Sequence, residues 1–409
     1  MNALWQVWLQ TARRHPDRVV ISEAESGHTL TCAQLTTAAV QRAATLPRGV
    51  IPFALPNSAD WFVQFLAIQQ RGGIAVPLEA GRQLPTLPAR RGIRLIKTTS
   101  GTTGQFQPIH CTAANLLADG RHVCATMGIK PTDINLALIP LGHSYGLGNL
   151  VMPLIQQGTP VICAAAFMPR QILQFIERYR VTVFPTVPAV LRALVQLPHP
   201  PRPAGLRLVI SAGAPLPPEL ARQFHETFGV RVHNFYGASE TGGICYDRTG
   251  RGRGVGRPLR GVRVTLRKDG RVTVASRAVV GTGRFVLADR GEWSPRGDLL
   301  LTGRVGVVAN IGGKKVAPAE IESALRQLPG VSDAWVTVLV DARGNDVLAA
   351  AVETRQTRAV VEAALARRLP LWQLPKRLFL AAQLPRTGRS KLDTGGLRAR
   401  LEPTAPPLR

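Results

Sequence analysis

The fold is decided around one stretch of sequence, Ile93-Arg94-Leu95-Ile96-Lys97-Thr98-Thr99-Ser100-Gly101-Thr102-Thr103-Gly104. Its first five residues predict a short strand, and Thr98 to Gly104 add hydroxyl side chains and two glycines. Glycines let the backbone turn and approach a ligand closely, and successive N–H groups and hydroxyls can then wrap a phosphate. A loop of this composition is more often a solvated turn, so its place in the chain has to decide between the two.

Strands and helices alternate on both sides of this loop. Apolar residues at helical spacing predict helices, and short apolar runs between turn residues predict strands. The predicted helices are 4–14, 31–46, 59–71, 148–157, 169–179 and 217–228, and the predicted strands are 49–55, 74–78, 93–97, 136–139, 159–164, 181–184, 206–210 and 231–235. This alternation predicts an α/β fold with a largely parallel sheet.

The pattern changes towards the C-terminus. Between Gly254 and Leu301, short β runs with many glycines indicate a small antiparallel or barrel-like unit. The elements predicted after Gly303-Arg304 are a helix over 318–328, strands over 334–340 and 347–352, and a helix over 358–368. We therefore expect a large N-terminal domain over 1–303 and a small mobile α+β domain over 304–409. A chain of 409 residues also suggests two or more domains by its length.

Composition narrows the class of protein. No apolar run approaches the roughly 20 residues that span a bilayer, and the N-terminus lacks the basic and apolar segments of a signal peptide. The five cysteines are scattered without a C-x-x-C pair. This pattern favours reduced thiols over a disulfide framework or a zinc site. We therefore expect a cytoplasmic protein without a membrane span.

The net charge is unusual. Lysine and arginine number 51 against 25 acidic residues, which gives a charge of +26, and only seven of the 51 are lysines. The basic residues are dispersed, so an arginine-rich composition bias is one interpretation. The other is a surface suited to acidic partners such as nucleotides, coenzyme A or an acidic carrier protein. Without a basic run or an aromatic-interleaved basic motif, nucleic acid is not the expected partner.

A second motif, Asn234-Phe235-Tyr236-Gly237-Ala238-Ser239-Glu240-Thr241, is placed after a predicted strand. The carboxyl ends of strands are where open α/β sheets bind ligands. The aromatic ring offers a stacking face, the glycine permits close approach, and the carboxylate is an oxygen ligand of the kind that magnesium prefers. Together with the loop at Thr98 to Gly104, this motif favours a nucleotide site over two unrelated turns.

With these motifs in order, the chain resembles the adenylate-forming superfamily: acyl- and aryl-CoA synthetases, the adenylation domains of peptide synthetases, and luciferases. The resemblance covers nearly all of the chain. It includes Pro140-Leu141-Gly142-His143-Ser144-Tyr145-Gly146, Ser211-Ala212-Gly213-Ala214-Pro215, Leu287-Ala288-Asp289, Gly303-Arg304, the segment from Ile311 to Glu322, and Pro385-Arg386-Thr387-Gly388-Arg389-Ser390-Lys391.

The resemblance implies a role for each matching residue. It implies that Lys391 is the adenylation lysine, that His143 lies beside the acyl pocket, and that Glu240 and Thr102 hold Mg²⁺ against the phosphates of ATP. The implied nucleotide-binding residues are Thr99, Ser100, Gly101, Thr102, Thr103, Gly104, Gly213, Ala214, Pro215, Asn234, Tyr236, Gly237, Ser239 and Asp289, with Arg304 before the hinge. Gly313 and Lys314 belong to the segment that lines the pantetheine tunnel in such enzymes.

Three features depart from the family pattern. The phosphate loop continues as Gln105-Phe106-Gln107-Pro108, so Gln107 replaces a lysine, and nucleotide binding would weaken by about 1–2 kcal/mol. Gly306 stands at a hinge position that is usually charged. Residues 79–97 are a short link to the loop where relatives carry a longer strand–helix stretch, and a homodimer would cover the gap.

The leading hypothesis is a ligase that works in two steps. A carboxylic acid and ATP give acyl-AMP and pyrophosphate, and the acyl group then passes to the thiol of coenzyme A or of a carrier-protein phosphopantetheine. The small or neutral residues expected around the acyl group favour an aromatic or fatty acid over an α-amino acid. The alternative is a non-catalytic or partly inactive nucleotide-binding homologue, which Gln107 and the short N-terminal region motivate.

Overall fold

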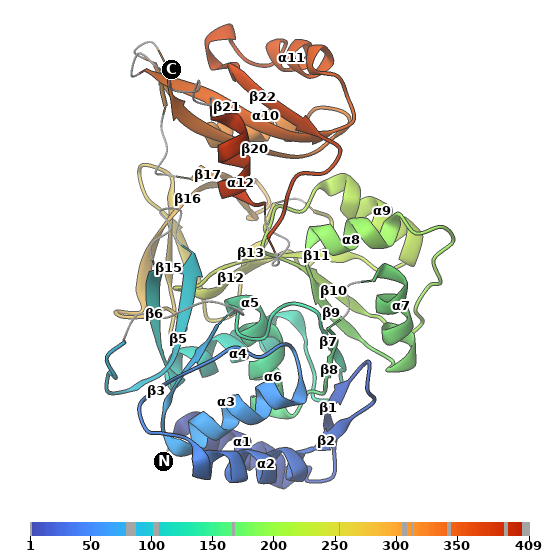
Figure 1. Cartoon of the computed structure of the whole chain (residues 1–409), viewed down its shortest axis with the longest axis vertical. Coiled ribbons are helices and arrows are strands. Elements are labelled where there is room, and N and C mark those ends of the chain that lie inside the picture. The colour runs from blue at the N-terminus through green and yellow to red at the C-terminus, as the bar shows by residue number, and fades with distance from the viewer. Residues whose placement is uncertain are drawn as a thin grey trace, which may run out of the picture. The chain divides into compact units, whose positions relative to one another are not determined.

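The computed structural model describes residues 2–78, 87–100, 106–165, 168–252, 254–304, 309–311, 314–341, 345–387 and 392–402. The chain forms two compact units (Figure 1). The first comprises Met1–Thr265, Thr273–Val286 and Trp293–Leu299, and the second comprises Leu266–Val272, Leu287–Glu292 and Leu300–Arg409. The second unit thus includes two segments that precede residue 303, and the domain division at residues 303 and 304 remains a prediction.

A nine-stranded sheet forms the frame of the first unit. Across the sheet, its strands are β13 (Arg257–Pro258), β12 (Gly242–Tyr246), β11 (Val232–Ala238), β10 (Leu208–Ser211), β9 (Val183–Thr186), β7 (Asn135–Ala137), β8 (Val161–Cys163), β1 (Val19–Glu23) and β2 (Thr29–Thr31). The strands from β11 to β1 are parallel. At the two edges, β12 is antiparallel to both β11 and β13, and β2 is antiparallel to β1. The predicted α/β fold with a largely parallel sheet is confirmed.

A second sheet of the first unit contains the strands on either side of the predicted phosphate loop. Its order is β3 (Val50–Phe53), β4 (Ile74–Pro77), β5 (Ile93–Ser100) and β6 (Phe106–Thr112). The first three strands are parallel, and β6 returns antiparallel to β5. The sequence placed the end of the strand at Lys97, but β5 continues through Thr98, Thr99 and Ser100 because these residues pair with β6.

Capping residues define the helices of the first unit. Thr31 and Thr112 each form a capping box, with Gln34 and Asn115 three residues later. Left-handed Gly72 ends the third helix. The helices are α1 (Ala3–Arg14), α2 (Cys32–Thr45), α3 (Ala59–Arg71), α4 (Ala113–Met127), the continuous series α5 (Ser144–Gly146), η1 (Leu147–Val151) and α6 (Met152–Gln157), then α7 (Pro169–Arg178), α8 (Pro188–Val195) and α9 (Pro218–Phe228).

Apolar helix faces bury the core of this unit. Helices α7, α8 and α9 lie along one part of the nine-stranded sheet (Figure 1), and Phe184 of β9 and Phe224 of α9 belong to the same buried cluster. Trp8, Phe62 and Phe65 of α1 and α3 are almost completely buried in the N-terminal part. Burial of such aromatic side chains is a large favourable contribution to folding.

The remaining elements are β-rich. A four-stranded sheet contains β14 (Arg263–Leu266), β15 (Arg271–Ala275), β16 (Arg284–Trp293) and β17 (Leu299–Arg304). The second unit then contains β18 (Ala309–Ile311), β19 (Lys314–Val316), α10 (Pro318–Arg326), β20 (Val331–Val340), β21 (Asp346–Thr354), α11 (Arg358–Ala366), η2 (Leu371–Gln373), β22 (Arg377–Ala381) and α12 (Thr394–Leu401). The predicted helices and strands over 318–368 agree with these elements.

Candidate active site

The segment with His143 follows the carboxyl end of β7, and the Asn57 side chain holds it in place. The amide of Asn57 donates to the carbonyls of Ala137 and Ile139 at 2.9 and 3.0 Å, and its oxygen accepts from Leu141 N–H at 3.1 Å. His143 is half-buried and immediately precedes α5. The turn before α5 therefore gives this histidine a fixed place beside the sheet edge.

Close backbone packing shapes the helix that follows His143. A Cβ on Gly146 would lie 2.1 Å from the carbonyl oxygen of Pro140, so only glycine fits there without displacement. Tyr145 is buried, and its hydroxyl donates to the carbonyl of Ile210 at 2.9 Å. The next turn, η1, is a π-helix, a rare form that is frequent at functional sites.

The segment Ser211-Ala212-Gly213-Ala214-Pro215 begins at the end of β10. Ser211 is buried and pairs in register with Asn234 of β11. Gly213 has a left-handed φ of +83° and is exposed, Ala214 is half-buried and Pro215 is exposed. The sequence predicts the edge of the adenine site at this strand end and turn, and that role remains a prediction.

Tyr236 and Gly237 lie within β11, whereas the sequence placed them in a loop after a strand ending at residue 235. The reason is the antiparallel strand β12, which pairs Tyr236 with Cys245 and Ala238 with Gly242 and so extends β11. Tyr236 is half-buried and Gly237 is exposed. The turn after Ala238 carries Ser239, Glu240 and Thr241.

The structure brings three predicted segments of the first unit together. The segments with His143, Ser211 and Tyr236 belong to the carboxyl ends of parallel strands of one sheet, which share an edge. Ser144 donates through its hydroxyl to the hydroxyl of Ser239 at 3.1 Å and links the first segment to the third. Asn234 anchors the third segment, since its amide donates to the Gly254 carbonyl at 3.0 Å.

Part of the predicted phosphate loop is described through its backbone alone. Thr99 and Ser100 are the last residues of β5 and pair with residues 107 and 106 of β6. Gly101, Thr102, Thr103 and Gly104 lie outside the described residues. The antiparallel pair nevertheless places the two ends of the loop side by side.

Sequence reasoning missed two buried charged residues close to this site. Lys97 of β5 is only 6% exposed, and its ammonium donates to the Ser239 carbonyl at 3.2 Å. Asp119 of α4 is likewise 6% exposed, and its carboxylate accepts from Gly243 N–H at 2.8 Å. The sequence offered one signal for each: Lys97 stands in a short run of apolar residues, and Asp119 stands between apolar helix positions.

The electrostatic surroundings connect these groups. Burial raises the pKa of Asp119, while the charge of Lys97 and the hydrogen bond from Gly243 lower it. Burial raises the pKa of the nearby Cys111 thiol. The charge of Lys97 lowers this pKa, and the charges of Asp119 and Glu240 raise it. The four side chains therefore share one neighbourhood under the β11–β12 turn.

The second unit holds the remaining predicted residues. Asp289 is half-buried in β16, Arg304 is the last residue of β17, and Lys314 is the first residue of β19. Gly313 and Lys391 lie outside the described residues. The chain on either side of Lys391 is close together, because Arg386 and Leu392 form an antiparallel bridge and Asp393 N–H donates to the Pro385 carbonyl at 2.9 Å.

The Glu240 carboxylate fits a magnesium ion held partly by phosphates. Glu240 is half-buried, its backbone carbonyl accepts from Val280 N–H at 3.0 Å, and within the described ranges its carboxylate has no hydrogen bond or ion pair. Among those residues, no group of three or more His, Cys, Asp or Glu could form an all-protein metal site. Mg²⁺ commonly binds one or two carboxylates together with substrate phosphates.

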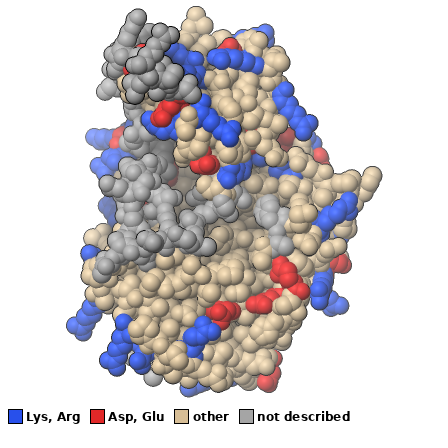
Figure 2. Space-filling model, viewed as in Figure 1, with Lys and Arg blue, Asp and Glu red and all other residues tan. Residues whose placement is uncertain are grey.

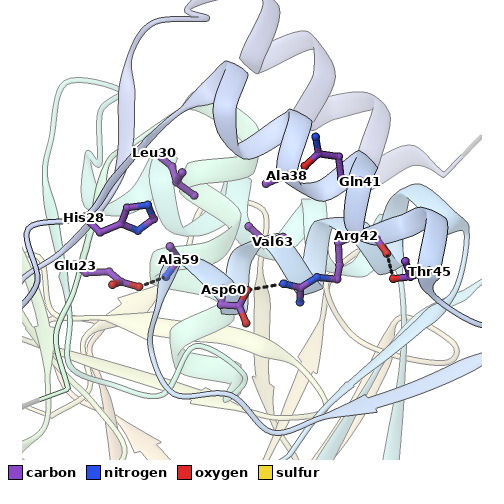
Figure 3. A pocket seen from close by; sticks show the side chains of 10 residues that line it. All are labelled: Glu23, His28, Leu30, Ala38, Gln41, Arg42, Thr45, Ala59, Asp60 and Val63. Carbon is purple, nitrogen blue, oxygen red and sulfur yellow. Dashed lines mark hydrogen bonds and ion pairs between the residues drawn. The ribbon is translucent and has the colours of Figure 1, made fainter.

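A groove in the first unit is lined by none of these residues. It has a volume of about 530 Å³, is open to solvent, and lies between the β1–β2 hairpin and helices α2 and α3 (Figure 3). Glu23 in it accepts from Ala59 N–H at 3.0 Å, and Arg42 pairs with Asp60 at 2.8 Å. Because these polar groups already bind one another, the groove gives no sign of a second active site.

The charge of the surface and the hydropathy of the helices describe the rest of the molecule. Figure 2 shows lysine and arginine side chains spread over the visible face, with acidic side chains between several of them. None of the helices in the described parts of the chain has the length and apolar character needed to cross a bilayer. On the visible face, the lysine and arginine side chains therefore form no single basic patch.

Comparisons with known proteins agree with this arrangement. Residues 82–283 match the model of the AMP-binding enzyme family, and residues 320–391 match the AMP-binding enzyme C-terminal domain. A sulfoacetate–CoA ligase from Cupriavidus necator is 30% identical over 333 residues, which is 73% of this chain and 65% of that protein. An indoleacetate–CoA ligase from Aromatoleum aromaticum is 26% identical over 82% of this chain and 72% of its own length.

A solved structure shares the whole fold. The structure of ATP-bound MatB from Rhodopseudomonas palustris superposes with a TM-score of 0.84 at 22% identity, and covers 98% of this chain and 99% of that chain. At this identity the likeness establishes the fold, with a large N-terminal and a small C-terminal part. The predicted fold class is therefore confirmed by both the sheet topology and the neighbour.

Proposed function

This chain belongs to the AMP-binding enzymes within the adenylate-forming ligases, and we propose that it converts a carboxylic acid and ATP into acyl-AMP and pyrophosphate and then transfers the acyl group to a thiol. One observation carries the proposal. The segments with His143, Ser211 and Tyr236 meet at the carboxyl edge of one parallel sheet, with the Ser144–Ser239 hydrogen bond between two of them. Such an edge is where α/β folds bind nucleotides and substrates.

The chemistry of the first step requires positive charge and fixed donors. A carboxylate that attacks the α-phosphorus meets negative charge on both reactants, so cations have to be present where charge accumulates. In the proposed site, Glu240 and Thr102 hold Mg²⁺, which would neutralise phosphate charge when bound. Lys391 approaches the attacking carboxylate and the α-phosphate, and Gln107 leaves the phosphate loop without the lysine that relatives use.

The nucleoside part of ATP has matching positions. Tyr236 presents a half-buried ring on β11, and we propose that adenine stacks on it. Gly213, Ala214, Pro215, Asn234, Gly237 and Ser239 surround the base and the α-phosphate in this proposal. Asp289 binds the ribose hydroxyls, and Arg304 precedes the hinge through which the second unit changes its role between the two steps.

The acid and the acceptor are proposed by class. The relatives compared above are named for coenzyme A ligation, which favours coenzyme A as the thiol. The +26 charge keeps an acidic carrier protein as the second acceptor, with Gly313 and Lys314 beside the pantetheine arm. The rings of buried Tyr145 and Phe235 have their centroids 5.7 Å apart. We propose that this aromatic pair, whose Tyr145 stands two residues after His143, borders the acyl pocket, which would favour an aromatic or other apolar acid.

Acid-dependent exchange of pyrophosphate into ATP tests the first step. The wild-type chain should exchange label with at least one acid from a panel of aromatic, fatty and small polar acids, and Lys391→Ala should lose nearly all of that exchange. The neighbouring Arg389→Ala is the matched control. If no acid supports exchange, the proposed first step is wrong and the alternative, a non-catalytic nucleotide-binding homologue, is favoured. If neither thiol consumes acyl-AMP, the proposed second step is wrong.

A further inference from the structure

Lys97 stands one residue before the predicted phosphate cradle, in a position buried by the sheet. It is 6% exposed, and its ammonium donates to the Ser239 carbonyl at 3.2 Å, across 142 positions of sequence. An ammonium group taken out of water is costly unless polar or charged groups surround it. Ser239 directly precedes Glu240, so the buried lysine contacts the turn on which the proposed magnesium ligand lies.

Asp119 holds the same turn from the opposite end. Its Oδ1 accepts from Gly243 N–H at 2.8 Å. The backbone around it is fitted to the carboxylate, because a Cβ on Gly242 would lie 2.4 Å from that oxygen, and Gly242 itself has a left-handed φ of +69°. Lys97 and Asp119 therefore bind the two ends of the Ser239–Gly243 segment.

Two further contacts fix the middle of this turn. Ser144 donates to the Ser239 hydroxyl at 3.1 Å, and Val280 N–H donates to the Glu240 carbonyl at 3.0 Å. The backbone of the turn is thus held by β5, α4, α5 and the segment at Val280. Within the part of the chain that the structure describes, the Glu240 carboxylate itself is left without a protein partner.

We propose that Lys97 and Asp119 are positioning residues that clamp the β11–β12 turn, so that the Glu240 carboxylate is presented to the magnesium ion and the phosphates of ATP. This inference rests on the proposed function. Lys97 also ties the turn to β5, the strand that leads directly into the phosphate loop.

A purely structural role is the competing explanation, in which Lys97 only balances the buried Asp119. Two variants separate the positioning role from the structural role: the single variant Lys97→Met, and the double variant that combines Lys97→Met with Asp119→Asn. Removing both charges abolishes the imbalance and restores stability under either explanation. The double variant lacks the Lys97–Ser239 contact under either explanation. Only the positioning role makes this contact necessary for presenting Glu240, so only that role predicts a lasting defect in metal-linked nucleotide binding.

Calorimetry of ATP binding, with Mg²⁺ and with EDTA, is the test, and thermal unfolding is measured in parallel. We expect Lys97→Met to raise the Kd of Mg·ATP about tenfold, with a smaller change for ATP in EDTA. The double variant should regain the unfolding temperature but keep the raised Kd. Lys97→Arg should recover part of the affinity, and Lys268→Met, at an exposed turn, should leave both quantities unchanged.

The outcomes distinguish the inference from the function on which it rests. If the double variant regains both stability and Mg·ATP affinity, Lys97 is a structural counter-charge and the positioning role is overturned. If Lys97→Met fails to fold, the charge-neutral double variant carries the same comparison against wild type. If the wild-type chain binds no Mg·ATP and exchanges no pyrophosphate, the proposed function itself fails.

Discussion

Asp133 shows how one buried carboxylate joins three strands of the main sheet. Its side chain is 5% exposed, and it accepts from Arg207 Nε at 2.8 Å, from Lys130 N–H at 2.7 Å and from the Thr182 hydroxyl at 2.8 Å. These partners precede β7, β9 and β10. Burial opposes the charged form, but the hydrogen bonds from Arg207, Lys130 and Thr182 outweigh it and lower the pKa of Asp133.

A carboxyl group with a lowered pKa stabilises the fold only while it is ionised. Its contribution is present above the ordinary aspartate pKa of about 3.9 and is lost as the pH falls through the lower value in the folded state. We expect Asp133→Ala to reduce the free energy of unfolding at neutral pH by about 2–3 kcal/mol, below the range for fully buried pairs because Arg207 is partly exposed.

Urea unfolding of wild type and Asp133→Ala at neutral pH and at about pH 3.5, near the ordinary aspartate pKa, measures this contribution. The difference between the two proteins should shrink in acid. The exposed Asp60, which pairs with Arg42, is the control, and its alanine variant should change stability by less than about 1 kcal/mol. An equal loss in both variants would contradict the role assigned to Asp133.

At the scale of elements, the helical series from α5 to α6 depends on one glycine. A Cβ on Gly146 would lie 2.1 Å from the Pro140 carbonyl oxygen, so Gly146→Ala has to push the His143 segment away from the helix. We expect a loss of about 1–3 kcal/mol in unfolding free energy, together with weaker pyrophosphate exchange. Gly205→Ala, whose Cβ would have only ordinary contacts beyond 3.5 Å, should be near neutral in the same assays.

In the second unit, Arg386 holds together β20, β21 and the segment that leads towards Lys391. It donates to Asp333 at 2.9 Å and to Glu353 at 3.0 Å, and Glu353 is only 3% exposed. Arg386→Met would leave the Glu353 carboxylate buried without this cation. We expect a loss of about 3 kcal/mol in unfolding free energy, measured by urea unfolding. Arg358→Met is the control, because the exposed pair of Arg358 with Glu362 contributes at most about 0.5 kcal/mol. Equal losses in the two variants would contradict this assignment.

Elements with clear periodicity could be predicted from the sequence, and the others could not. Helices α1, α2, α3, α7 and α9 have apolar faces and marked ends, so their predicted ranges agree with the structure. Helix α4 was missed because Asp119 and Gly120 interrupt its buried face. The contacts of Lys97 and Asp119 join residues more than a hundred positions apart, and a single sequence contains no direct signal for such pairs.

At the scale of the whole molecule, the +26 charge should act on the acceptor thiol. If the acceptor carries phosphates or acidic residues, its KM should rise when salt increases from about 0.05 M to about 0.5 M, because screening shortens the range of attraction. Pantetheine, which has the same thiol arm without the nucleotide phosphates, is the control. Equal salt dependence for coenzyme A and pantetheine would contradict an electrostatic role for the surface.

The order of strands in the main sheet also bears on how the chain folds during synthesis. β1 lies between β2 and β8, and Ile21 pairs with Val161. The sheet of β3 to β6 uses only residues 50–112, so it can close long before β8 leaves the ribosome. Val20 and Ile21 are fully buried in the finished protein. On the nascent chain β1 can pair with β2 but lacks its β8 neighbour, which makes β1 a strand that chaperones have reason to shield.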